Sequence, residues 1–169
     1  MSGPLILLVG MMGAGKTTVG RAIAQRTGWV YLDNDELVEQ ATGSTPPHLL
    51  ATGGEGALRA AETQALRRAV ALPPPAVAGV AGGVVLDPGN REMLRAVPGV
   101  VWLRARPQTL IHRVGTGAGR AWLQPDPAAV IGALASAREP YYSHVARIVV
   151  DVDDRTADEV AAAVLSALD

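Results

Sequence analysis

Residues 5–18 read LILLVGMMGAGKTT. The run Leu5–Val9 is continuously apolar, which is typical of a strand buried on both faces of a sheet. The eight residues from Gly10 to Thr17 then match the phosphate-loop pattern G-x-x-x-x-G-K-[ST]. Apolar residues follow at helical spacing until Gly28, where we expect the helix to end. This order of strand, glycine loop and helix predicts a site for the phosphates of a nucleoside triphosphate.

The chemistry of the loop supports the same interpretation. Its glycines let backbone N–H groups curl around an anion, and the helix that follows points its positive end at that anion. The lysine can bridge the β- and γ-phosphates, and the threonine hydroxyl can bind Mg²⁺. An ordinary glycine turn before a helix is the alternative. The residues expected to hold the nucleotide here are Gly13, Ala14, Gly15, Lys16, Thr17 and Thr18.

The bulk composition excludes several classes of function. The chain has 169 residues, 49% of them hydrophobic and 18% charged, which fits one globular domain. Its net charge of −1 predicts no general attraction to nucleic acid or membranes. The absence of cysteine excludes disulfides, zinc thiolate sites and thiol catalysis. No signal or membrane-spanning segment is recognised at the start, so we expect a cytoplasmic protein, and a monomer.

Apolar strands alternate with helical stretches along the rest of the chain. This alternation predicts an α/β fold with a parallel sheet that is covered by helices on both faces. The expected strands are residues 5–9, 30–32, 76–81, 100–103 and 148–150. The expected helices are residues 17–26, 36–41, 55–72, a helix opened by Pro107, a helix from Asp126-Pro127 to Tyr141, and a last helix opened by the capping box of residues 156–159.

Two acidic residues follow the second expected strand. Asp33 and Asp35 are two positions apart, so in extended chain their side chains project to one side. The carboxyl ends of parallel strands line the ligand crevice, which would bring the pair close to the phosphates. One carboxylate could hold Mg²⁺ through water while the other deprotonates an attacking hydroxyl. The alternative is a turn in which an aspartate caps the following helix.

The candidate basic residues are less specific. Arg59 and Glu62 share a helix face and, taken alone, are more typical of a solvated ion pair. Arg113, Arg120 and Arg138 have a similar alternative as surface charges. Arg120 differs because it follows the glycine-rich residues 115–119, where a closing lid would carry it onto the transferred phosphate and exclude water.

Taken together, these motifs resemble the shikimate kinase family over essentially the whole chain. The resemblance rests on five segments: the phosphate loop, LDNDELVE at 32–39, GEGALRAAE at 54–62, AGG at 81–83 and REPYY at 138–142. It implies a three-layer α/β/α sandwich around five parallel strands, like that of the nucleoside-monophosphate kinases. It also implies one domain, with a lid at about residues 113–125 and a substrate-binding helical region at about 34–62.

The family's roles carry over residue by residue. Asp33 would be an outer-shell magnesium ligand, and Asp35 would bind the substrate hydroxyl and act as the base. The residues implied to bind the substrate are Asp35, Arg59, Glu62, Gly82, Gly83 and Arg138. The resemblance places Arg113 and Arg155 near the adenine and Arg120 on the phosphates, so that Lys16, Asp35 and Arg120 form the catalytic set with Mg²⁺ and ATP.

The resemblance implies phosphorylation of shikimate to shikimate 3-phosphate. Departures from the family pattern leave one alternative, a sister kinase acting on another hydroxy acid or cyclitol. A non-catalytic nucleotide-binding protein is a separate alternative, although every charged role is kept. Ala81 replaces the first glycine of a triple glycine, and the lid carries Ala121 and Trp122 in place of proline and leucine. Leu50 and Leu58 stand where two phenylalanines usually line the acceptor pocket, although the chain contains no phenylalanine at all.

Overall fold

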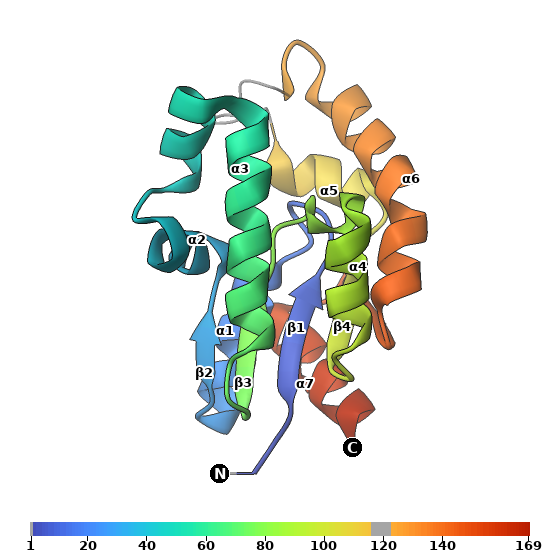
Figure 1. Ribbon diagram of the computed structural model, residues 1–169. Helices are drawn as coiled ribbons and strands as arrows, with labels where there is room; N and C mark the ends of the chain where they lie inside the picture. The colour runs from blue at the N-terminus through green and yellow to red at the C-terminus, as the bar shows by residue number, and fades with distance from the viewer. Residues whose placement is uncertain (1, 116–122) are drawn as a thin grey trace.

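The computed structural model describes residues 2–115 and 123–169. Five strands form one sheet in which every neighbouring pair is parallel, in the order β2-β3-β1-β4-β5 (Figure 1). The strands are β1 (Leu5–Val9), β2 (Val30–Leu32), β3 (Ala76–Gly79), β4 (Val100–Arg104) and β5 (Ile148–Asp151). The predicted five-stranded parallel sheet is therefore confirmed. β1 lies at the centre, between β3 and β4, so the phosphate loop leaves the middle of the sheet, where ligands bind in open α/β folds.

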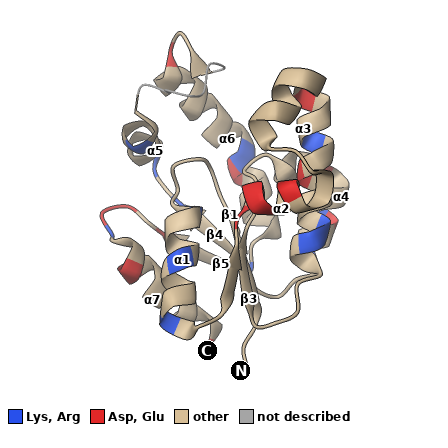
Figure 2. Cartoon of the chain, turned by 90° about the vertical axis from the view of Figure 1, so that its left-hand side faces the viewer, with Lys and Arg blue, Asp and Glu red and all other residues tan. Residues whose placement is uncertain are grey.

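Helices cover both faces of the sheet, as expected for an α/β/α sandwich. Figures 1 and 2 show α1 and α7 on one face and α3 and α4 on the other. The helices are α1 (Lys16–Thr27), α2 (Asn34–Thr42), α3 (Pro46–Val70), α4 (Pro88–Arg95), α5 (Pro107–Val114), α6 (Pro127–Val145) and α7 (Ala157–Leu168), with a 3₁₀ turn, η1 (Val84–Leu86).

Several helix ends follow directly from the sequence. Gly28 and Gly43 both adopt the left-handed conformation at helix C-termini, at φ 75° and 73°. The capping box of α7 is complete, because the Thr156 side chain accepts from the Glu159 N–H and the Glu159 carboxylate accepts from the Thr156 N–H. These local signals confirm the predicted boundaries to within one or two residues.

Three helical segments were missed. The helix expected at residues 55–72 is preceded by another that begins at Pro46, and the two meet at Gly54, whose φ of 75° and ψ of −173° are not helical. The turn η1 and the helix α4 were not predicted either. Thr45 and Asp87 cap two of these segments by accepting backbone N–H groups, and a proline follows each cap. A proline is tolerated in the first turn of a helix, so each cap followed by proline is a helix-start signal that was not used.

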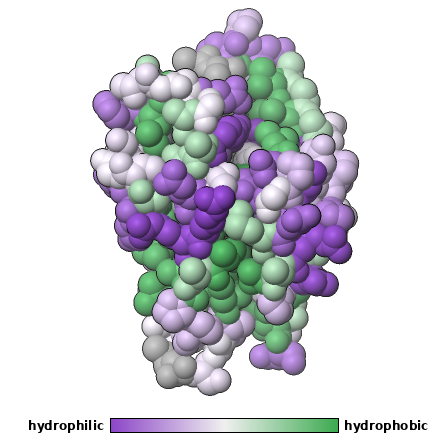
Figure 3. Space-filling model, viewed as in Figure 1, coloured by the Kyte–Doolittle hydropathy of each residue, from purple (hydrophilic) through white to green (hydrophobic). Residues whose placement is uncertain are grey.

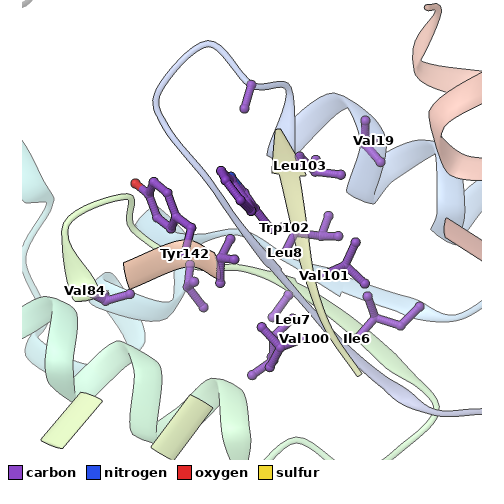
Figure 4. Close-up of a cluster of buried hydrophobic side chains, with 14 of the residues drawn as sticks. Ile6, Leu7, Leu8, Val19, Val84, Val100, Val101, Trp102, Leu103 and Tyr142 are labelled. Atoms are coloured by element: carbon purple, nitrogen blue, oxygen red, sulfur yellow. The ribbon is translucent and has the colours of Figure 1, made fainter. Parts of the chain in front are cut away.

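The core lies between the sheet and its two helical layers. Ile6, Leu7 and Leu8 are fully buried, which confirms that β1 is covered on both faces. Figure 4 shows these side chains packed with those of β4 and with Tyr142 of α6. The face in Figure 3 is mixed, with hydrophilic side chains on both flanks and hydrophobic ones between and below them. Among residues 2–115 and 123–169, no helix has the length and apolarity needed to cross a membrane.

Candidate active site

The phosphate loop joins β1 to α1 in a conformation that requires glycine. Gly10, Gly13 and Gly15 have φ values of 145°, 82° and 95°, which residues with a side chain rarely adopt. Lys16 folds back over this loop, and its Nζ donates to the carbonyl oxygens of Gly10 at 2.7 Å and Met11 at 3.0 Å. The loop thus holds the ammonium group and the N-terminus of α1 on one side of an open space.

That space is a cavity of about 1230 Å³ at the carboxyl edge of the sheet. It contains much of the site predicted from sequence. The predicted residues that line it are Gly13, Ala14, Gly15, Lys16, Thr17, Thr18, Asp35, Glu62, Gly82, Arg113 and Arg155. The nucleotide loop, the acidic segment and part of the expected acceptor site therefore face one volume.

A second cavity of about 340 Å³ adjoins the first and contains the rest of the expected acceptor site. Arg59, Gly83 and Arg138 line it, and it shares Lys16 and Gly82 with the larger cavity. Figure 2 shows acidic residues at the start of α2 and basic residues on α3 and α6 around this end of the sheet. An acceptor bound by the arginines would lie next to the phosphate end of the nucleotide site.

Arg59 and Glu62 form an ion pair on α3 in which the carboxylate is buried and the guanidinium partly exposed, so the pair is less solvated than the helix pattern alone favours. Glu62 is only 6% exposed, and its carboxylate accepts from Arg59 Nη1 at 2.8 Å. Glu55 lies on the other side of the guanidinium, at 3.6 Å. The guanidinium also packs directly on Gly83, where a Cβ atom would overlap it. Arg59 is therefore fixed in position at the edge of the smaller cavity.

Arg138 on α6 is a buried cation. It is 5% exposed, and its Nε is buried without a hydrogen-bond partner among the described residues. No ion pair joins it to any acidic side chain in residues 2–115 and 123–169. The surface-charge alternative for Arg138 is wrong. A buried arginine without a paired carboxylate, facing a cavity, can receive an anionic ligand.

The two aspartates differ in their surroundings. One oxygen of Asp33 accepts the Glu36 N–H at 3.0 Å, so the capping alternative describes this residue correctly. Asp33 does not line either cavity, whereas Asp35 lines the larger one. Partial burial, and then the charge of Asp33, raise the pKa of the Asp35 carboxyl above its ordinary value. A carboxylate with a raised pKa is better suited to accept a proton.

The donors needed for Mg²⁺ lie near the loop. Thr17 and Asp35 line the larger cavity with a hydroxyl and a carboxylate, and Asp33, whose charge acts on Asp35, adds a carboxylate outside that lining. Mg²⁺ prefers oxygen ligands of these kinds. The carboxylates lie close enough that the charge of Asp33 acts on Asp35, and a bound cation would relieve that repulsion. The residues present therefore fit a magnesium ion that is held partly through water.

Two of the arginines that were predicted to bind the nucleotide line the larger cavity. Arg113 Nη1 donates to the carbonyl oxygen of Gly13 at 3.2 Å, so the end of α5 is tied to the phosphate loop. Arg155, in the loop after β5, donates to the Asp151 carbonyl oxygen at 3.2 Å and also lines the larger cavity. Arg120, Ala121 and Trp122, which were assigned to the lid, lie outside the described residues.

Two contributors to the site were not found from the sequence. The first is the helix that begins at Pro46, which supplies part of the cavity wall; Leu50, which the family resemblance already placed at the acceptor pocket, lies on it and lines both cavities together with Leu58. The cap at Thr45 followed by two prolines was the signal for this helix. The second contributor is Tyr142, whose hydroxyl donates to the carbonyl oxygen of Gly82 at 2.7 Å. No local sequence pattern predicts that contact, because the two segments are far apart in the chain.

Comparisons with known proteins agree with this arrangement. The family model described as shikimate kinase matches residues 12–169. A shikimate kinase of Symbiobacterium thermophilum is 41% identical over 166 residues, which cover 96% of this chain and 95% of that protein. One of Moorella thermoacetica is 42% identical over 163 residues, covering 96% and 93%.

A solved structure extends the likeness to three dimensions. The structure of shikimate kinase from Acinetobacter baumannii in complex with shikimate superimposes with a TM-score of 0.89 at 33% identity. The superposition covers 97% of this chain and 92% of that one. Sequence and structure thus agree over nearly the full length of both proteins, and this chain belongs to the shikimate kinase family.

Proposed function

We propose that this protein transfers the γ-phosphoryl group of ATP to a hydroxyl group of shikimate, giving shikimate 3-phosphate and ADP. The observation that carries the proposal is the position of the buried Arg138, which faces a cavity that also includes Lys16 of the phosphate loop. A carboxylated acceptor held by Arg138 and Arg59 would have its ring beside the terminal phosphate. Membership of the shikimate kinase family supports shikimate as that acceptor.

The phosphates of ATP would bind to the loop amides of residues 13–18, at the N-terminus of α1. Lys16 would contact the β- and γ-phosphates, since its side chain already lies over the loop. Arg113 and Arg155 would lie toward the adenine. Arg120 would add positive charge to the transferred group from the lid, and this role comes from the family resemblance alone.

Mg²⁺ would be held by the hydroxyl of Thr17 and, through water, by Asp33. When bound, the ion would neutralise charge on the phosphate oxygens during transfer. The chain's own contribution is to fix the donors. The Asp33 carboxylate is oriented by its hydrogen bond to the Glu36 N–H, and Thr17 is the second residue of α1.

Asp35 would accept the proton of the attacking hydroxyl. Its raised pKa favours this role, and it lines the same cavity as the phosphate loop. The phosphoryl group would pass directly from ATP to the acceptor, because nothing in the sequence suggests a phosphorylated enzyme intermediate. Most of the rate enhancement would come from orientation and charge stabilisation.

The test is ADP release coupled to pyruvate kinase and lactate dehydrogenase, with shikimate, quinate and gluconate as separate acceptors and with an acceptor-free background. We expect turnover with shikimate, and NMR spectroscopy of the product locates the phosphate. Lys16→Ala should abolish turnover, whereas Arg21→Ala, at an exposed position of the same helix, should not. Shikimate that gives no more ADP than the background at millimolar concentration would refute the proposal.

A further inference from the structure

Tyr142 lies at the junction between the acceptor arginine and the loop after β3. Its side chain, on α6, is 1% exposed and packs beside the indole of Trp102, with ring centroids 5.8 Å apart (Figure 4). The hydroxyl reaches the opposite segment and donates to the Gly82 carbonyl oxygen at 2.7 Å. The phenol is therefore held by packing at one end and by a hydrogen bond at the other.

Gly82 is the place where three parts of the site meet. A Cβ atom on this residue would lie 3.1 Å from the Gly10 carbonyl oxygen, 3.3 Å from the Tyr142 hydroxyl and 3.5 Å from Arg138 Nη1. The Gly10 carbonyl is also the group that receives the Lys16 ammonium. Gly82 therefore lies close both to the loop that holds the Lys16 ammonium and to the Arg138 guanidinium, and all three residues line the smaller cavity.

Arg138 depends on few polar contacts to keep its orientation. It precedes Tyr142 by one helical turn, so the two side chains share a face of α6. Its Nε is buried without a hydrogen-bond partner among the described residues. Burial raises the pKa of Tyr142 to about 12, against the opposing effects of the Arg138 charge and of its hydrogen bond to that arginine. The hydroxyl therefore stays protonated and serves as a donor at physiological pH.

We propose that Tyr142 is a positioning residue for the carboxylate of the acceptor. Its hydroxyl fixes the Gly82 carbonyl and braces the Arg138 guanidinium against it, which sets the distance between the acceptor carboxylate and the phosphate loop. This inference rests on the proposed function, because it requires an acceptor with a carboxylate. Tyr142 lines neither cavity, so it would touch neither the phosphates nor the reacting hydroxyl.

Tyr142→Phe tests this role, since it removes the hydroxyl and keeps the ring. The neighbouring Tyr141→Phe is the matched control, because Tyr141 is 37% exposed and packs under Arg91 instead. We expect Tyr142→Phe to raise KM for shikimate about 3- to 10-fold, as the loss of one hydrogen bond predicts, with kcat and KM for ATP within about twofold. Tyr141→Phe should match the wild type.

A shikimate analogue with a primary alcohol in place of the carboxylate separates positioning from general loosening. It lacks the group that Arg138 binds, so its kcat/KM should be the same with Tyr142→Phe as with the wild type. Two results would overturn the inference while the proposed function stands. One is that Tyr142→Phe loses kcat/KM equally for shikimate and for the analogue; the other is that Tyr142→Phe has the same kinetic constants as Tyr141→Phe. Wild-type enzyme that leaves shikimate unphosphorylated overturns both.

Discussion

Replacing Arg59 with methionine removes a cation that is held from several sides. Its guanidinium lies 2.8 Å from Glu62 and 3.6 Å from Glu55, and it packs on the backbone of Gly83. The Arg59 side chain is 34% exposed, whereas that of Glu62 is only 8% exposed. The substitution therefore leaves a carboxylate buried without its partner, while methionine keeps most of the apolar stem.

Arg59→Met should lower both the stability of the protein and its affinity for the acceptor. A hydrogen bond to a charged group contributes about 1.5–3 kcal/mol to stability. Breaking this pair should cost less free energy than breaking a fully buried ion pair, because Arg59 is partly exposed. We expect a loss of about 2 kcal/mol, which lowers Tm by about 4–8 °C in a domain of this size. Loss of one charge-assisted contact to the acceptor carboxylate should raise KM for shikimate about 10- to 150-fold.

The assay is coupled ADP release at saturating ATP and then at saturating shikimate, together with thermal unfolding of the same preparations. Arg67→Met is the control, because Arg67 is exposed on the same helix and should change neither KM nor Tm. KM for ATP should stay within about twofold of the wild-type value. Equal increases of KM for both substrates, or an unchanged KM for shikimate, would show that Arg59 does not bind the acceptor.

Three further substitutions test the proposed base and the packing of two glycines. Burial and the charge of Asp33 raise the pKa of the Asp35 carboxyl in the folded state above its ordinary value. The folded state therefore binds the carboxyl proton more tightly than the unfolded state does, and the protein loses stability as the pH rises from the ordinary pKa through the raised one. Asp35→Asn should therefore melt higher than the wild type above that window in thermal scans without ligand, while kcat falls about 100- to 10,000-fold. Gly20→Ala should cost about 1–3 kcal/mol in urea unfolding, because its Cβ would overlap the ring of Tyr31. Gly56 lies in α3, and a Cβ atom added there would meet nothing within 4 Å. Gly56→Ala should therefore stabilise the protein by about 0.5–1 kcal/mol, because glycine is less favourable than alanine within a helix.

The parts of the fold that were predictable have local causes. The apolar run of β1, the left-handed glycines at 28 and 43 and the capping box at Thr156 each act over a few residues. The missed segments have local causes too, at Thr45 and Asp87, but each cap stands beside a proline that also marks turns. The sequence signal was ambiguous there, and tertiary packing resolved it.

The sequence could predict which charged residues belong to the candidate site, but not how deeply those residues are buried. Residue types and spacing singled out Lys16 and Asp35, and the family resemblance singled out the arginines, whereas the helix pattern alone favoured a solvated surface for Arg59 and Glu62. Their actual environment depends on η1 and α4, which pack against α3 and line a cavity together with the pair. Tyr142 was missed for a related reason, since its contact with Gly82 joins segments 60 residues apart.

The two arginines that we propose bind the acceptor differ in a way that would explain a requirement for a carboxylate. The positive charge of Arg59 is already balanced by the carboxylates of Glu62 and Glu55, so a bound anion would stabilise that charge little further. Arg138 is as buried as Glu62 but forms no ion pair in the described part of the chain, and burying an unpaired cation is costly. A carboxylated acceptor would relieve that cost on binding, whereas an uncharged polyol would leave it in place. Arg138 would therefore set the requirement for the carboxylate, and Arg59 would set its orientation.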